Sequence, residues 1–113
     1  MDFESMASDH MIVELQDEFH VRTIGGRVRS AVGDWPEEVV PAMEIRPVRR
    51  SDAASTTAAV VSPDGVFEIR NVPPGKYCFR TMALGWQTVI GTILVDPKAP
   101  HERRLLIEMP LGQ

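Results

Sequence analysis

The chain has 113 residues, of which 43% are apolar and 25% charged, with a net charge of −4 and one cysteine. These proportions are ordinary for a globular domain, and a chain of this length can bury its own core without metal or disulfide support. The lone Cys78 excludes an internal disulfide, and no apolar run approaches the roughly 20 residues that a membrane-spanning helix needs.

The charge is unevenly distributed along the chain. Residues 1–20 hold six acidic residues and no Lys or Arg, while residues 21–113 carry a net charge of +2. The near-neutral body argues against nucleic acid as the main partner, since phosphate binding needs a dense basic face. We predict that residues 1–20 form an acidic leader that is a solvated tail or partly ordered, with partner docking as the alternative.

The sequence leaves the compartment open. The first ten residues lack the basic and apolar regions of a secretory signal. The single cysteine is compatible with the cytoplasm.

The elements, taken in chain order, are predicted to be strands. The segment 11–19 has apolar residues at helical spacing, but we favour a short strand or an irregular lead-in. Beyond it, runs rich in β-branched and aromatic residues alternate with short turns that contain Gly, Pro or Asp. We expect strands within 19–30, 39–48, 56–62, 66–70, 76–86, 88–95 and 103–109.

Strict alternation within these runs predicts which residues enter the core. Parallel neighbours need long crossover connections, usually helical, so we predict an antiparallel sheet. About seven half-buried strands then pack best as two sheets face to face, which predicts a single all-β Greek-key β-sandwich over residues 21–113. Phe67, Ile69, Tyr77 and Phe79 are predicted to point inward. Alternation also groups, each on one face of its strand, Ile24 with Gly26 and Val28, Met43 with Ile45, Thr81 and Ala83 with Tyr77 and Phe79, and Leu105 with Ile107 and Met109.

Two sharp turns bracket the strand at 66–70. In Pro63-Asp64-Gly65, proline fixes φ, aspartate bonds nearby backbone and glycine accepts a positive φ. Pro73-Pro74-Gly75 forms the second turn.

The arrangement of these motifs resembles the carboxypeptidase regulatory-like domain of the transthyretin-like (prealbumin-like) β-sandwich group. The resemblance covers roughly residues 25–109 and implies a transthyretin-like fold. It also implies a non-catalytic module, of a kind attached to peptidases, receptors and surface proteins, with related sandwiches that bind glycans. A secreted or cell-envelope setting would fit this resemblance. The matching residues are Gly26, Val28, Asp64, Gly65, Phe67, Pro74, Gly75, Tyr77 and Gly85, with Trp86 where tyrosine is usual.

No catalytic constellation is evident in the sequence, so we expect no enzyme activity and no cofactor. The three histidines His10, His20 and His101 are far apart and have no metal-ligand spacing. Hydroxyisourate hydrolases share the transthyretin-like fold but end in Tyr-Arg-Gly-Ser, whereas this chain ends in "MPLGQ".

Two tryptophans are candidate binding residues. Trp35 lies in a predicted loop, where it can cap the end of the fold or serve as a stacking platform for a ligand. Trp86 is expected mainly to pack at the core or its rim.

A strand face and a basic cluster complete the candidates. Cys78 is out of phase with Tyr77 and Phe79, so it should face away from the core, together with Met82 and Leu84. Arg49 and Arg50, with Arg46, form a basic cluster that is expected to be solvated or to dock an acidic segment. We therefore expect a module that contacts a protein partner through a sheet edge or the Cys78/Met82/Leu84 face, with glycan binding through Trp35 as the alternative.

Overall fold

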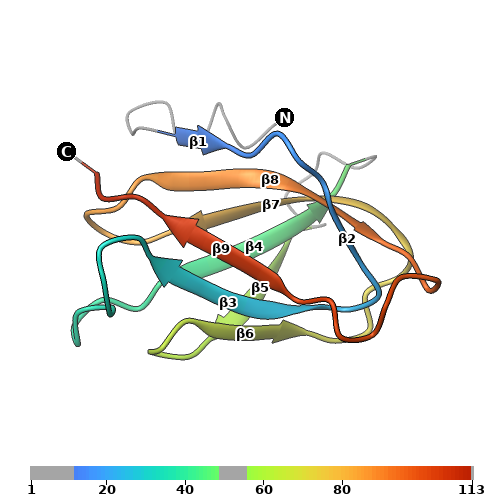
Figure 1. Ribbon diagram of the computed structural model, residues 1–113, viewed down its shortest axis with the longest axis horizontal. Coiled ribbons are helices and arrows are strands. Elements are labelled where there is room, and N and C mark those ends of the chain that lie inside the picture. Colours follow the sequence, from blue (N-terminus) through green and yellow to red (C-terminus); the bar gives the residue numbers. More distant parts are fainter. Residues whose placement is uncertain (1–11, 49–55, 113) are drawn as a thin grey trace.

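The computed structural model describes residues 12–48 and 56–112 (Figure 1). Within these residues the chain forms nine strands and no helix, so the predicted all-β class is confirmed. The strands are β1 (Ile12–Glu14), β2 (Phe19–Val21), β3 (Ile24–Ser30), β4 (Ala42–Pro47), β5 (Thr57–Val61), β6 (Val66–Ile69), β7 (Gly75–Met82), β8 (Thr88–Val95) and β9 (Leu105–Met109).

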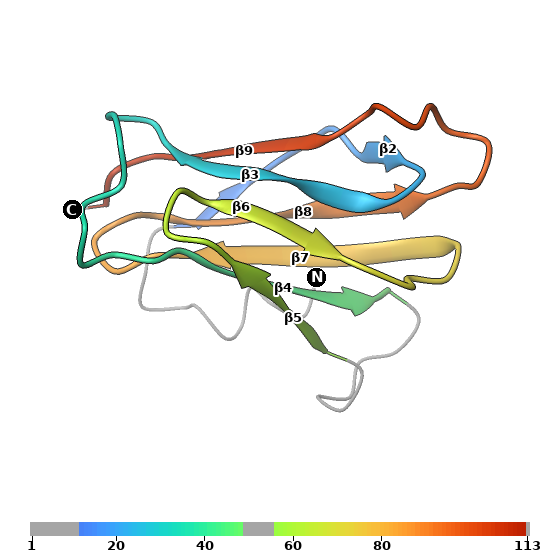
Figure 2. The same cartoon turned by 90° about the horizontal axis from the view of Figure 1, so that it is seen from below.

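The nine strands belong to one strongly curled sheet with the order β1-β8-β7-β4-β5-β6-β3-β9, and β2 also pairs with β8. The strand β5 links the two halves of the curl. Its first part pairs with β4 and its last residues pair with β6 (Figure 2). Because the sheet curls, strands that are far apart in the sheet enclose one core.

The expectation of an antiparallel sheet was wrong for three of the pairings. The strands β1 and β2 both run parallel to β8, and β3 runs parallel to β9. The requirement for a crossover helix applies to parallel strands joined by a short connection. Here most of the fold lies between the paired strands along the chain, so it serves as the connection.

The strand count also exceeds the predicted seven, because the segments before Ile24 contribute two short strands. Both lie partly within the acidic leader, which therefore enters the sheet at Ile12–Glu14 and Phe19–Val21. The amide of Leu15 donates to the carbonyl of Ile90 at 2.9 Å, and the ring of Phe19 lies 5.9 Å from that of Phe79. Residues 1–11 lie outside the described residues.

The core lies inside the curl and follows the predicted alternation. Phe79 is fully buried on β7, between the neighbouring strands β4 and β8. The four residues predicted to point inward, Phe67, Ile69, Tyr77 and Phe79, are buried. Of the residues placed on one face of the other strands or with Tyr77 and Phe79, Ala83 and Gly26 are half-buried, and the rest are buried: Ile24, Val28, Met43, Ile45, Thr81, Leu105, Ile107 and Met109. Side-chain alternation therefore identified part of the core, which also contains Val21 and the β8 residues Val89, Ile93 and Val95.

Both predicted turns form where expected. In the β5–β6 turn, Gly65 has a φ of +88° and its amide donates to the carbonyl of Ser62 at 2.8 Å. The carbonyl of Gly65 accepts from the amide of Val28 on β3 at 2.8 Å, which ties this turn to the neighbouring strand. In the β6–β7 turn, the hydroxyl of Tyr77 donates to the carbonyl of Pro73 at 2.7 Å.

Candidate interaction surface

The half of the sheet formed by β5, β6, β3 and β9 has one face in the core and one face in solvent. We call the solvent side the outer face. It is formed by every second residue of these strands, and the residues between them are buried or half-buried except Thr57 at the start of β5. Such one-sided burial is typical of a sheet that covers a core on one side only. The exposed residues of the outer face are Val60, Val66, Glu68, Arg27, Arg29, Leu106 and Glu108, and Gly25 is buried between them.

The strand register places apolar side chains near one another on the outer face. Arg27 is paired with Val66 on β6 and with Leu106 on β9, so the three residues form one row across the strands. Glu68 is paired with Gly25 and with Val60 in the adjacent row. The exposed fractions of Val60, Leu106 and Val66 are 87%, 53% and 43%. Three large apolar residues are thus exposed within two adjacent rows of one face.

The outer face carries two arginines and two glutamates, and charges of both signs border it. Arg29 donates to Glu108 at 2.5 Å, and Arg70, just beyond β6, donates to Glu68 at 3.0 Å. Neither Arg27 nor Arg104 has a hydrogen bond or an ion pair to any other residue that the structure describes. The guanidinium of Arg104 lies over Gly25, where an added Cβ would be 2.5 Å from its Nη1 atom. Two arginines without a hydrogen bond or ion pair among the described residues therefore accompany the apolar residues, and the charge of Arg27 acts on the carboxylate of Asp64.

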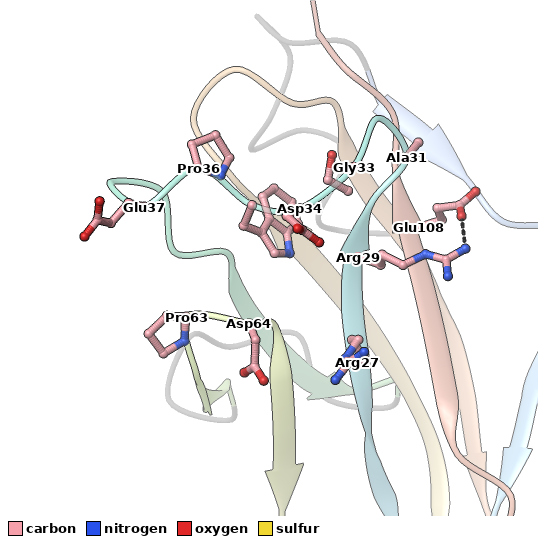
Figure 3. A pocket seen from close by; sticks show the side chains of 12 residues that line it. Arg27, Arg29, Ala31, Gly33, Asp34, Pro36, Glu37, Pro63, Asp64 and Glu108 are labelled. Atoms are coloured by element: carbon pink, nitrogen blue, oxygen red, sulfur yellow. Dashed lines mark hydrogen bonds and ion pairs between the residues drawn. The ribbon is translucent and has the colours of Figure 1, made fainter.

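A hollow of about 610 Å³ adjoins one end of the outer face, and we call it the end pocket. Arg27 and Arg29 border it from β3, and Asp64 borders it from the β5–β6 turn (Figure 3). The loop after β3 supplies Asp34 and Trp35. Charged groups of both signs thus surround an indole ring in the end pocket.

Trp35 is held in place by packing and a hydrogen bond. Its Nε1 atom donates to the carbonyl of Val28 at 2.9 Å, and its ring lies 5.0 Å from that of Trp86 with a tilt of 56°. Trp86 in turn donates from Nε1 to the hydroxyl of the buried Ser30 at 3.0 Å. Both tryptophans are half-buried. Of the two predicted roles for Trp35, this geometry supports capping, and only its remaining exposed surface lines the end pocket.

This packing gives a prediction for Trp35. The Trp35→Phe change removes the hydrogen bond to Val28 and should lower the free energy of unfolding by about 1 kcal/mol. The Trp35→Ala change also removes the contact with Trp86 and should cost about 2–3 kcal/mol, since the ring is only half-buried. Urea denaturation followed by circular dichroism measures both values. Unchanged stability in Trp35→Ala would mean that the ring is not a structural cap.

Asp64 at the mouth of the end pocket has a lowered pKa. The main cause is a hydrogen bond from the hydroxyl of Ser62, which outweighs the opposing effect of desolvation, and backbone amides and the charge of Arg27 lower the pKa further. The folded state therefore favours the carboxylate. Its contribution to stability is present above the ordinary aspartate pKa of about 3.9 and is lost as the pH falls through the lowered value.

We predict that Ser62→Ala raises the pKa of Asp64 toward its ordinary value. A carboxyl-carbon NMR titration measures this shift directly. Asp96 is the internal control, because its lowered pKa comes first from the amide of Lys98 and then from His20, far from Ser62 in the sequence. An Asp64 pKa that stays low in Ser62→Ala would show that another group holds the carboxylate.

The predicted Cys78/Met82/Leu84 face does not exist as one surface. The strand β7 ends at Met82, and the chain then turns through Gly85, whose φ is +95°. Leu84 therefore stands 91% exposed in the β7–β8 turn, while Cys78 and Met82 are half-buried on β7. Cys78 does alternate with the buried Tyr77 and Phe79, as predicted.

The side of β4, β7 and β8 that carries Cys78 is largely withdrawn from solvent. Ile90 is fully buried there, and Arg80 forms an ion pair with Glu44 across the strands. Arg46, expected to be solvated, is only 7% exposed on β4, opposite Cys78. Arg49 and Arg50 lie outside the described residues.

The outer face was not among the predicted sites. Val60, Val66 and Leu106 each occupy a polar-phase position in an alternating strand, which is a weak signal that was present in the sequence. Their proximity depends on the pairing of β3 with both β6 and β9, and the parallel β3–β9 pair was not predicted.

Neither a scan against protein-family models nor a search of the curated proteins finds a match for this chain. Among the described residues, no group of three or more His, Cys, Asp or Glu side chains is arranged to hold a metal ion. The described part of the chain also has no helix with the length and hydropathy needed to cross a membrane.

Proposed function

We propose that this protein is a non-catalytic interaction module that binds a protein partner through the outer face of β5, β6, β3 and β9. The observation that carries this proposal is the exposure of Val60, Val66 and Leu106 within two adjacent rows of that face. Exposed apolar side chains gathered among polar and charged ones are typical of protein interfaces. Arginine, which flanks them here, is also enriched in such interfaces.

The burial of the Cys78 side of β4, β7 and β8 also supports the outer face as the interface. Ile90 and Arg46 on β8 and β4 are withdrawn from solvent, whereas the outer face is accessible along its strands. The outer face is also built on paired strands, which hold its side chains in fixed positions. A partner therefore meets a preformed surface, which limits the entropy lost on binding.

We also propose that the curled sheet is a variant of the transthyretin-like Greek-key β-sandwich of carboxypeptidase regulatory-like domains. Support comes from the single core between the two halves of the curl and from the two turns that contain Gly65 and Gly75. Function in such a scaffold depends on its surfaces rather than on the fold itself.

A binding experiment with matched variants tests the proposed interface. The double variant Val60→Glu/Leu106→Glu should capture the partner from lysate of the source cells about tenfold or more less well than the wild type, because both apolar contacts would be lost. Leu84→Glu is the control, since Leu84 is as exposed as Val60 but lies in the β7–β8 turn. Equal capture by both variants would rule out the outer face as the interface.

Glycan binding at the end pocket is the second candidate. It is favoured by the exposed part of Trp35 beside the carboxylates of Asp34 and Asp64, because sugars bind aromatic surfaces flanked by planar polar groups. Titration with soluble starch and other polysaccharides should then shift the tryptophan fluorescence of the wild type, and Asp34→Ala should weaken the shift. No response across a broad glycan array would exclude this candidate.

A further inference from the structure

We propose that two copies of this chain associate through the free edge of β9, with the two β9 strands paired antiparallel about a two-fold axis. This inference goes beyond the proposed function, because it concerns the edge of the sheet and a second copy of the same chain. Three features of β9 support it: its unpaired backbone groups, the order of charges along it, and the exposed leucine at the centre of that order.

The strand β9 ends the sheet and is paired only with β3. The carbonyl of Met109 accepts the amide of Ala31 at 3.0 Å, so Met109 and every second residue before it turn their backbone groups toward β3. The amides and carbonyls of Leu106 and Glu108 therefore point away from β3, and no hydrogen bond joins these backbone groups to another residue that the structure describes. Such a row of unpaired groups is a template for a further strand.

The side chains along this edge have an order that is complementary to itself. Arg104 directly precedes β9, and Leu106 and Glu108 follow at every second position, so positive, apolar and negative side chains succeed one another on one side of the strand. In an antiparallel pair centred on Leu106, that leucine faces its own copy, and Arg104 of each chain faces Glu108 of the other. An in-register parallel pair would instead place like charges opposite each other.

The two charged residues can pair across the axis without giving up an existing bond. Arg104 has no hydrogen bond or ion pair to another described residue, and its guanidinium lies over Gly25. Glu108 is bound by Arg29 at 2.5 Å, and a carboxylate can accept from a second guanidinium as well. Exposed ion pairs contribute little affinity, so they select the direction and register of the pair, while the backbone bonds and the covered Leu106 hold it together.

The test measures the mass of the full chain in solution by sedimentation velocity. Concentrations from about 10 µM to about 1 mM are used, because a single strand pair is smaller than a standard interface and binds weakly. The variants are Arg104→Glu, Glu108→Arg, an equal mixture of these two, and Leu106→Pro, with Leu84→Glu in the β7–β8 turn as the control. Proline at position 106 removes only an amide that points to the free edge, so β9 keeps its bonds to β3. Circular dichroism checks that each variant is folded.

The wild type and Leu84→Glu should dimerise as the concentration rises, and Leu106→Pro should stay monomeric. Arg104→Glu and Glu108→Arg should each dimerise at least about tenfold more weakly, because like charges then face each other twice across the axis. Their mixture should recover dimerisation, since in a mixed pair opposite charges meet at both positions. A monomeric wild type, a mixture that dimerises no better than its components, or a folded Leu106→Pro that still dimerises would overturn the proposal. If Leu106→Pro does not fold, the mixture decides alone.

Discussion

Replacing Phe79 with alanine is expected to lower the free energy of unfolding by about 3–5 kcal/mol. Phe79 is fully buried on β7, and its ring lies 5.9 Å from that of Phe19 and directly against Gly91. Gly91 has no side chain, so the ring fills the space on β8 that a side chain would occupy. Removing the ring leaves a cavity that spans the contact between β7, β8 and the leader strand β2.

Urea unfolding of the purified variants measures this loss. Total stabilities of about 5–15 kcal/mol mean that Phe79→Ala can unfold the protein outright, so Phe79→Leu, with an expected loss of about 1–2 kcal/mol, keeps the comparison measurable. Leu84→Ala is the surface control and should stay within about 0.5 kcal/mol of wild type. A Phe79→Ala protein that loses less than about 1 kcal/mol would contradict the described core.

Replacing Gly65 with alanine should cost at least about 3 kcal/mol, because backbone strain and a steric clash act together. The φ of Gly65 is +88°, and an added Cβ would lie 2.0 Å from the carbonyl oxygen of Val28. That carbonyl belongs to β3 and also accepts the Nε1 hydrogen of Trp35. Relief of the clash would therefore displace both the β5–β6 turn and the tryptophan cap.

Gly85→Ala separates the clash from the strain. Gly85 has a similar φ of +95°, but an added Cβ there would meet no atom within 4 Å. Gly85→Ala should therefore lower the free energy of unfolding only by the strain of a positive φ, about 1–2 kcal/mol. Equal losses in the two variants, measured by chemical denaturation, would show that the turn at Gly65 does not press against β3.

The strands and the core could be predicted from the sequence because both depend on local patterns. Alternation of apolar and polar residues identified the inward side chains of β7 and β9, such as Phe79 and Ile107. The turn at Gly65 followed from the backbone preferences of proline, aspartate and glycine. Each of these signals lies within a few residues of the feature that it predicts.

The parallel pairs could not be predicted in the same way, because they join distant segments. Nothing near Gly26 in the sequence indicates that it lies opposite Leu105, or that Val13 lies opposite Val89. Strand direction is decided by how the whole sheet curls around its core. The prediction of an all-antiparallel sheet considered connections between successive strands only.

In the candidate site, too, the sequence predicted local features but not contacts between distant segments. The sequence allowed Trp35 to be a cap or a platform, and the choice required its contacts with Val28 and Trp86. The predicted Cys78 face failed because the chain leaves β7 before Leu84. The outer face was missed because its apolar residues come from three strands whose register was unknown.

Photo-crosslinking at residue 60 tests whether the outer face binds a partner. A benzoylphenylalanine at position 60, whose native valine is 87% exposed, places the reactive group on the outer face. The same group at position 84, whose native leucine is 91% exposed, lies in the β7–β8 turn. The account predicts a discrete partner adduct from position 60 that Leu106→Glu abolishes, and no such adduct from position 84. Adducts of equal yield at both positions, or from position 84 alone, would contradict it.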